Sequence, residues 1–159
     1  MDWIPPTQTV AAVVQAVAAV VMVASLWLTK NQLKLSRELE ANTFEDGFAQ
    51  QYREIVHRIP IEALLGEQLS QDELTENLDD FFRYFDLCNE QTFLRQIRRI
   101  RRDTWVLWRD GMRSNFSRPA FASAWKIVSA KCPDDFHELR SLVNTGFVGD
   151  PCPTNVSLS

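Results

Sequence analysis

Residues 70–94 read SQDELTENLDDFFRYFDLCNEQTFL, and their pattern is typical of a helix at the centre of a core. Ser70 and Glu73 have the S-x-x-E spacing of a capping box, which satisfies backbone N–H groups at the start of a helix. Apolar side chains then recur at helical spacing from Leu74 to Phe93 and form one wide face. We therefore predict a helix from Ser70 to about Leu94.

Helices are also predicted on the C-terminal side of this segment. Residues 103–115 carry tryptophans one turn apart, and residues 117–130 begin with a serine cap and Pro119 in the first turn. A last short helix is expected from residues 133–135 to Val143, and no segment has the pattern of a strand hairpin. The aromatic residues predicted for the core are Phe81, Phe85, Trp105, Trp108 and Trp125. This pattern predicts an all-α fold, a bundle of about four to five helices.

Outward from this bundle, the N-terminal part of the chain is strongly apolar. Residues 9–29, TVAAVVQAVAAVVMVASLWLT, contain no charge. A helix needs roughly 20 apolar residues to cross the hydrocarbon core of a bilayer. The flank before the segment has no basic residue and the flank after it is a poor cleavage site, so a signal peptide is disfavoured. We predict an N-terminal transmembrane helix over residues 9–29.

The charges beside this segment predict its orientation. Lys30, Lys34 and Arg37 follow it, and basic residues stay on the cytoplasmic side of a membrane. We expect a short external N-terminus at residues 1–8 and a cytoplasmic bundle, whose three cysteines would stay reduced. A long connecting helix is expected over residues 30–59, with Asp46-Gly47 as a point where it could break. The helical domain would then cover residues 60–143 and a mobile tail residues 144–159.

Three short motifs resemble a widespread family of uncharacterised bacterial proteins with one N-terminal transmembrane helix. They are Tyr-Phe-x-Leu-Cys at residues 84–88, Trp-x-x-Trp-x-x-Gly at residues 105–111 and Pro-x-Phe-x-x-x-Trp at residues 119–125. The glutamate of the first motif comes one position late, at Glu90. The similarity covers residues 40–145 and implies this helical fold and a place in the bacterial inner membrane. It implies no activity.

A looser similarity connects the chain to membrane-anchored accessory proteins of RNA-targeting CRISPR loci. That resemblance implies a helical domain whose ribonuclease form uses an Arg-x4-His motif. The nearest match here is Arg53-x3-His57, which is one residue short. We therefore expect no enzymatic activity, and a degenerate nuclease stays as the remaining enzymatic alternative. No phosphate loop, nucleophile elbow or metal-ligand spacing is present, so neither a cofactor nor a metal is predicted.

Basic residues concentrate where the chain turns after the central helix. Residues 95–118 hold eight arginines and two aspartates, whereas residues 62–90 hold nine acidic residues and one arginine, in a chain of net charge −4. The guanidinium fork suits phosphate. The candidate residues for binding RNA, DNA or a nucleotide are Arg95, Arg98, Arg99, Arg101 and Arg102. A solvated or intersubunit face, or a contact with lipid headgroups, would account for the same cluster.

Small residues mark one face of the apolar segment. Ala12, Gln15, Ala16 and Ala19 fall on one side of a helix, where small side chains allow membrane helices to approach and a polar side chain can bond across them. This pattern predicts a homo-oligomer in the lipid bilayer. The resulting hypothesis is an inner-membrane protein that acts by self-association, with a cytosolic protein as a further partner. Its most concrete version is a pore-forming or membrane-perturbing antiviral effector, and the alternative is a tethered RNA- or nucleotide-binding module.

Overall fold

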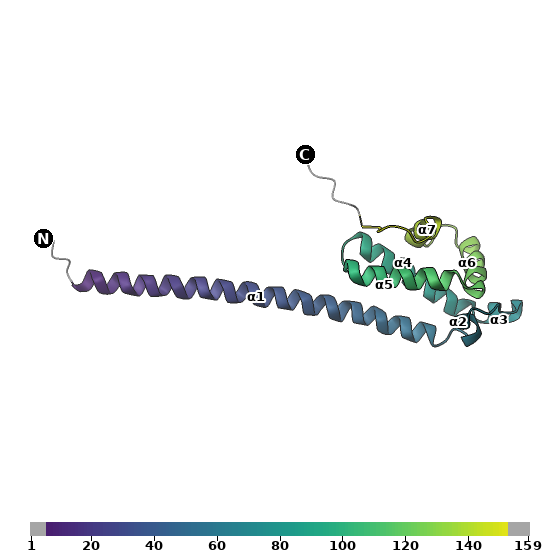
Figure 1. The fold of residues 1–159 in the computed structure, drawn as a ribbon, viewed down its shortest axis with the longest axis horizontal. Helices are drawn as coiled ribbons and strands as arrows, with labels where there is room; N and C mark the ends of the chain where they lie inside the picture. Colours follow the sequence, from purple (N-terminus) through teal and green to yellow (C-terminus); the bar gives the residue numbers. More distant parts are fainter. Residues whose placement is uncertain (1–5, 153–159) are drawn as a thin grey trace, which may run out of the picture. The chain divides into compact units, whose positions relative to one another are not determined.

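The computed structural model describes residues 6–152, except for the side chains of some residues in the first 41 positions. Within this part the chain is helical and contains no strand, so the all-α prediction is confirmed. Figure 1 follows the helices along the chain. They are α1 (Pro6–Val56), α2 (Ile61–Leu65), α3 (Gln71–Glu76), α4 (Leu78–Gln96), α5 (Arg102–Phe116), α6 (Pro119–Lys131) and α7 (His137–Asn144).

The chain divides into two units, Met1–Thr43 and Phe44–Ser159. The described part of the first unit is helix α1 alone. Its large apolar side chains with described positions are exposed, and they are Met22, Leu26, Trp27, Leu28, Leu33 and Leu39. No helix in residues 6–152 meets the combination of length and apolar character that crossing a membrane requires, judged on the residues described. Most side chains of the predicted span, residues 9–29, lie outside the described part, as does most of the predicted external N-terminus.

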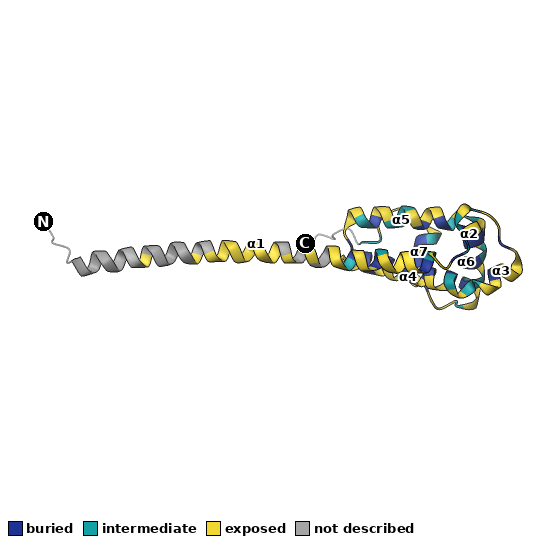
Figure 2. Cartoon of the chain, turned by 90° about the horizontal axis from the view of Figure 1, so that it is seen from below, coloured by how far each residue is buried: buried dark blue, intermediate teal, exposed yellow. Residues whose placement is uncertain are grey.

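The second unit is built around α4. This helix packs against α5, α6 and α7, and buried residues concentrate where these helices face one another (Figure 2). Phe81, Phe85 and Trp105 are fully buried, and Trp108 and Trp125 are partly buried against the same core. Edge-to-face ring contacts join α4 to α6, with 5.1 Å between the ring centroids of Phe81 and Phe121. The residues predicted to form the aromatic core therefore lie in it or against it.

The structure contains one of the caps predicted at the starts of two helices. The Ser70 hydroxyl accepts a hydrogen bond from the Glu73 N–H at 3.3 Å and the Glu73 carboxylate accepts one from the Ser70 N–H, so the predicted capping box is present. The helix it opens ends at Glu76, because the chain turns at Asn77 before α4 begins. The predicted serine cap of α6 is wrong. The Ser117 hydroxyl donates to the Ser114 carbonyl oxygen at 2.7 Å, and Arg118 caps α6 without a side-chain bond.

Three turns after helices share one hydrogen-bond pattern. After α2, the Gly66 N–H donates to the Ala63 carbonyl oxygen and the Glu67 N–H to that of Glu62. The same pair of bonds recurs at Gly146 and at Arg98, and all three residues have left-handed backbone, with φ of 91°, 66° and 63°. This is the Schellman motif, in which glycine is the usual left-handed residue. Arginine therefore occupies a glycine position in the turn between α4 and α5.

Two expectations at the ends of the domain differ from the structure. Helix α1 passes through Asp46-Gly47 without a break, because buried side chains hold it on both sides of the glycine, Glu45 before it and Phe48 and Ile55 after it. The predicted mobile tail begins too early, since Phe147 is buried and Asp150 is ion-paired to Arg95. An apolar anchor and a salt bridge therefore hold the chain past residue 144.

Candidate functional site

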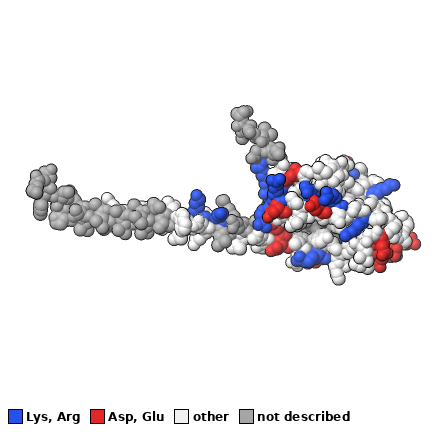
Figure 3. Space-filling view, viewed as in Figure 1, with Lys and Arg blue, Asp and Glu red and all other residues white. Residues whose placement is uncertain are grey.

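The five candidate arginines lie at the end of α4, in the turn that follows and at the start of α5. We call Arg95, Arg98, Arg99, Arg101 and Arg102 the arginine turn. Figure 3 shows basic side chains gathered at this end of the domain, with acidic side chains beside them. The structure thus brings the five residues together, and the acidic neighbours decide what each of them can do.

Arg95 has a structural partner. Its side chain is only 10% exposed, and its Nε and terminal nitrogen donate to the two carboxylate oxygens of Asp150 at 2.8 and 2.6 Å. A third nitrogen donates to the Ile100 carbonyl oxygen at 2.8 Å. The hydrogen bonds from Arg95 hold the pKa of Asp150 below its ordinary value. Because the Arg95 guanidinium is buried and bonded on three sides, it is not placed to bind an external phosphate.

Arg101 is joined to the long helix through Glu45. Both the Arg101 backbone N–H and its guanidinium donate to the Glu45 carboxylate, the shortest contact being 2.6 Å, and the Thr104 hydroxyl donates at 2.7 Å. Burial by itself would raise the pKa of Glu45, but these hydrogen bonds outweigh it and lower that pKa. The Arg101 side chain is half exposed, whereas Glu45 is buried. The pair therefore fixes the start of α5 against α1.

The remaining members of the turn are exposed. The Arg99 guanidinium lies 4.8 Å from the centre of the Phe44 ring, a cation–π distance. Arg98 holds the left-handed position, and Arg102 begins α5. Trp105, one turn into α5, is fully buried and offers no stacking surface for a base. The turn thus presents three exposed cations, while Arg95 and Arg101 are held by carboxylates of the same chain.

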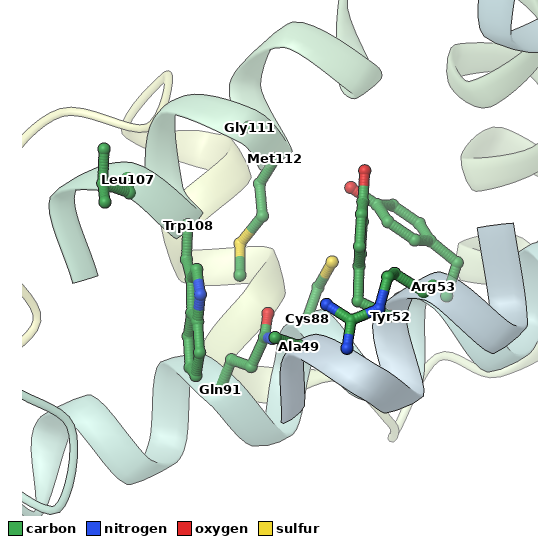
Figure 4. Close-up of a pocket in the computed structure, with 10 residues that line it drawn as sticks. Ala49, Tyr52, Arg53, Cys88, Gln91, Leu107, Trp108, Gly111 and Met112 are labelled. Carbon is green, nitrogen blue, oxygen red and sulfur yellow. The ribbon is translucent and has the colours of Figure 1, made fainter. Parts of the chain in front are cut away.

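A pocket lies on another side of the same helices. It measures about 350 Å³ and opens between α1, α4 and α5 (Figure 4). Its lining residues are Ala49, Tyr52, Arg53, Tyr84, Cys88, Gln91, Leu107, Trp108, Gly111 and Met112. Aromatic and aliphatic side chains form most of this wall, and a few polar groups converge on it, which is the usual composition of a small-molecule site.

The cysteine that lines the pocket is not activated. Cys88 is fully buried, and burial raises the pKa of its thiol to about 12, so it is the thiol and not the nucleophilic thiolate at neutral pH. His57, in the turn after α1, and His137, at the start of α7, are both exposed. Among residues 6–152 no group of three or more His, Cys, Asp or Glu side chains is placed to hold a metal ion. Within the described residues, the arrangement of the pocket supports binding.

Comparisons with protein-family models, with curated proteins and with solved structures give no match to this chain. The resemblance to the bacterial membrane family thus rests on its motifs and stays a prediction.

Sequence reasoning found neither the carboxylates that bind Arg95 and Arg101 nor the pocket. Glu45 and Asp150 lie 56 and 55 residues from the arginines that they bind, and nothing in their local sequence distinguishes them from surface carboxylates. Gly111 was visible in the sequence as a glycine inside a helical pattern, which is the one local signal for an unusual position. Of the predicted oligomer face, the Gln15 side chain is exposed, and those of Ala12, Ala16 and Ala19 lie outside the described residues.

Proposed function

We propose that the chain is a single-pass membrane protein that acts by self-association, with its helical domain in the cytoplasm. The observation that carries the proposal is the uncharged segment at residues 9–29, which is followed directly by basic residues. Its length matches the roughly 20 residues that a bilayer core requires. The helical backbone of α1 runs through this segment and past it.

The exposed apolar side chains of α1 support the same proposal. Met22, Leu26 and Trp27 are 63%, 71% and 63% exposed, and Leu33 beyond the basic flank is still 54% exposed. Apolar surface of this extent on one helix is typical of a segment covered by lipid or by another chain. Trp27 lies near the end of the apolar segment, where an indole favours the membrane–water interface.

Self-association is the mode of action that the small-residue face favours. Gln15 is a polar side chain in an otherwise apolar helix, and a hydrogen bond between copies would satisfy it at a gain of about 0.5–2 kcal/mol. The resemblance to accessory proteins of antiviral systems suggests a defence effector that perturbs the bilayer. In such an effector a ring of α1 helices would enclose Gln15.

The test begins with the full chain in bacterial cells. We expect it to resist extraction from membranes at alkaline pH, and a reporter joined after the last residue should be active on the cytoplasmic side. Recovery of the chain in the soluble fraction without detergent would refute the membrane assignment. Recovery in the membrane with an external reporter would refute only the orientation.

Self-association is then measured by crosslinking in native membranes. Gln15→Leu should reduce the crosslinked species, because it removes the polar group while keeping the helix apolar. Val13→Leu is the matched control, since a step of about 100° per residue places Val13 on the opposite side of the helix from Gln15. A wild-type chain that remains monomeric in membranes would refute the oligomer.

The alternative, a membrane-tethered module that binds RNA or a nucleotide, rests on the arginine turn. Three of its five members, Arg98, Arg99 and Arg102, are exposed, and the other two are bound by carboxylates within the fold. A phosphate-binding turn would give an affinity for RNA that falls steeply with salt and falls again in Arg99→Gln and Arg102→Gln. Absence of RNA binding at low salt would exclude this alternative.

A further inference from the structure

The pocket between α1, α4 and α5 is shaped at one point by the absence of a side chain. Gly111 lies inside α5 and lines this pocket. A Cβ built on Gly111 would meet no atom within 4 Å, and its backbone is not in the left-handed region. Glycine inside a helix costs about 1 kcal/mol relative to alanine. Since neither close packing nor backbone conformation requires glycine here, its effect is to widen the pocket.

Two polar side chains at the pocket have no partner in the described part of the chain. Gln91 is 5% exposed, yet its amide makes no hydrogen bond with residues 6–152. Among the described residues, the fully enclosed side-chain polar atom that has no hydrogen-bond partner is Trp105 Nε1, so the Gln91 amide still reaches the solvent in the pocket and is open to a bound molecule. The Arg53 residue is exposed, and its guanidinium makes no ion pair or hydrogen bond with the described residues.

These groups surround one space. Figure 4 shows Arg53 of α1, Gln91 of α4 and Trp108 of α5 directed toward the same interior. The apolar part of the wall is aromatic at Tyr52, Tyr84 and Trp108. A flat ring suits such walls because aromatic groups pack with offset or edge-to-face geometry. A single guanidinium suits one carboxylate, whereas a phosphate chain would require more donors than this pocket offers.

We propose that this pocket binds a small aromatic carboxylate. The ring packs against Trp108 in the space left by Gly111, the carboxylate pairs with Arg53, and a polar atom of the ligand bonds to the Gln91 amide. The cavity of about 350 Å³ lies within the range of small-molecule sites, roughly 300–1,000 Å³. This site is separate from the arginine turn, and it does not depend on what α1 does in the membrane.

The test uses para-trifluoromethylbenzoate as the probe and the full chain in lipid nanodiscs. Fluorine NMR of the probe reports binding as line broadening relative to empty nanodiscs. We expect broadening with the wild-type chain and none with Gly111→Leu, whose side chain would occupy the pocket. Gly47→Leu is the matched control, because Gly47 is also a helical glycine with no atom within 4 Å of its Cβ but does not line the pocket.

A second pair of variants tests the charge. Arg53→Gln should weaken binding by about tenfold to a hundredfold, the loss expected for a charged hydrogen bond. Arg58→Gln should bind as the wild type does, since Arg58 lies outside this pocket. The uncharged para-trifluoromethylbenzamide should bind the wild-type chain as weakly as the acid binds Arg53→Gln.

Two results would overturn the proposal. One is the absence of binding tighter than about 1 mM for the wild-type chain. The other is equal broadening for Gly111→Leu and Gly47→Leu, which would place the probe elsewhere on the protein. If the chain is soluble and does not enter nanodiscs, the membrane proposal fails, and the same fluorine experiment in buffer still decides the pocket.

Discussion

At the scale of single residues, the arginine turn shows how one side-chain type performs several tasks. Arg95 forms a salt bridge with Asp150, and Arg101 forms one with Glu45. Arg98 occupies the left-handed position of a Schellman motif. The sequence reveals the surplus of positive charge at this place. It does not reveal which guanidinium is buried, because that depends on carboxylates that are distant along the chain.

The backbone at position 98 leads to the first prediction. Arg98→Gly should raise the free energy of unfolding by up to about 1 kcal/mol, because left-handed backbone is unfavourable for a residue with a Cβ and costs glycine little. The measurement is chemical unfolding of the full chain in mild detergent, followed by tryptophan fluorescence.

Arg102→Gly is its control, since it removes the same charge from a residue in ordinary helical conformation at the start of α5. That variant should be destabilised. Equal stabilisation of both variants would instead show that repulsion among the arginines, and not backbone conformation, limits stability in the turn.

The second prediction concerns the stability of the folded chain at acidic pH. The pKa values of Glu45 and Asp150 are lowered in the folded chain, so the folded state binds fewer protons than the unfolded state at acidic pH. Stability should therefore be constant above the ordinary carboxyl pKa values of about 4 and should decrease as pH falls through the lowered folded values. Thermal unfolding as a function of pH measures this.

Replacing both carboxylates distinguishes their contribution to the loss of stability at acidic pH from the contribution of other acidic residues. The double variant Glu45→Gln and Asp150→Asn should be less stable than the wild type at neutral pH and should lose less stability on acidification. If stability falls as steeply with decreasing pH in the double variant as in the wild type, other carboxylates cause the acid sensitivity.

At the scale of elements, local signals predicted where most helices of the domain lie. Helices were expected over residues 103–115 and 117–130, and the structure places α5 at Arg102–Phe116 and α6 at Pro119–Lys131. The helical spacing of apolar residues and the position of Pro119 are enough to predict where these two helices lie. The turn at Asn77 was not predicted, because the apolar face continues across it. The pocket could not be predicted, since it exists only where three helices meet.

Helix α5 offers the third prediction, which compares two glycines. Gly111→Ala should stabilise the chain by about 1 kcal/mol, because it removes the cost of glycine from a helix interior and meets no neighbouring atom. Gly146→Ala should destabilise it, since φ at Gly146 is +66°. Both are measured by chemical unfolding. A loss of stability in Gly111→Ala would mean that glycine is required for the helix and not for the space beside it.

At the scale of the whole molecule, the buried core of the second unit controls access to its most enclosed thiol. Cys88 is 1% exposed, and burial raises its pKa to about 12. Cys132 is partly exposed. A thiolate, and not a thiol, reacts with alkylating reagents. The reactivity of Cys88 should therefore report how often the core opens.

The fourth prediction follows from this difference. At neutral pH an alkylating reagent should modify Cys132 much faster than Cys88 in the full chain, as measured by mass spectrometry of the digested protein. In denaturant the two rates should become similar, because the burial of Cys88 is then lost. Fast modification of native Cys88 would mean that the pocket beside it admits the reagent or that the core opens readily.

The bond between Asp150 and Arg95 has a practical consequence for anyone who labels this protein. It draws the end of the described chain to the turn between α4 and α5. A fluorophore or affinity tag attached just beyond that carboxylate would hang over the exposed guanidinium groups and compete with any anion that approaches them. A dye on Cys132, which follows α6, would leave that face uncovered.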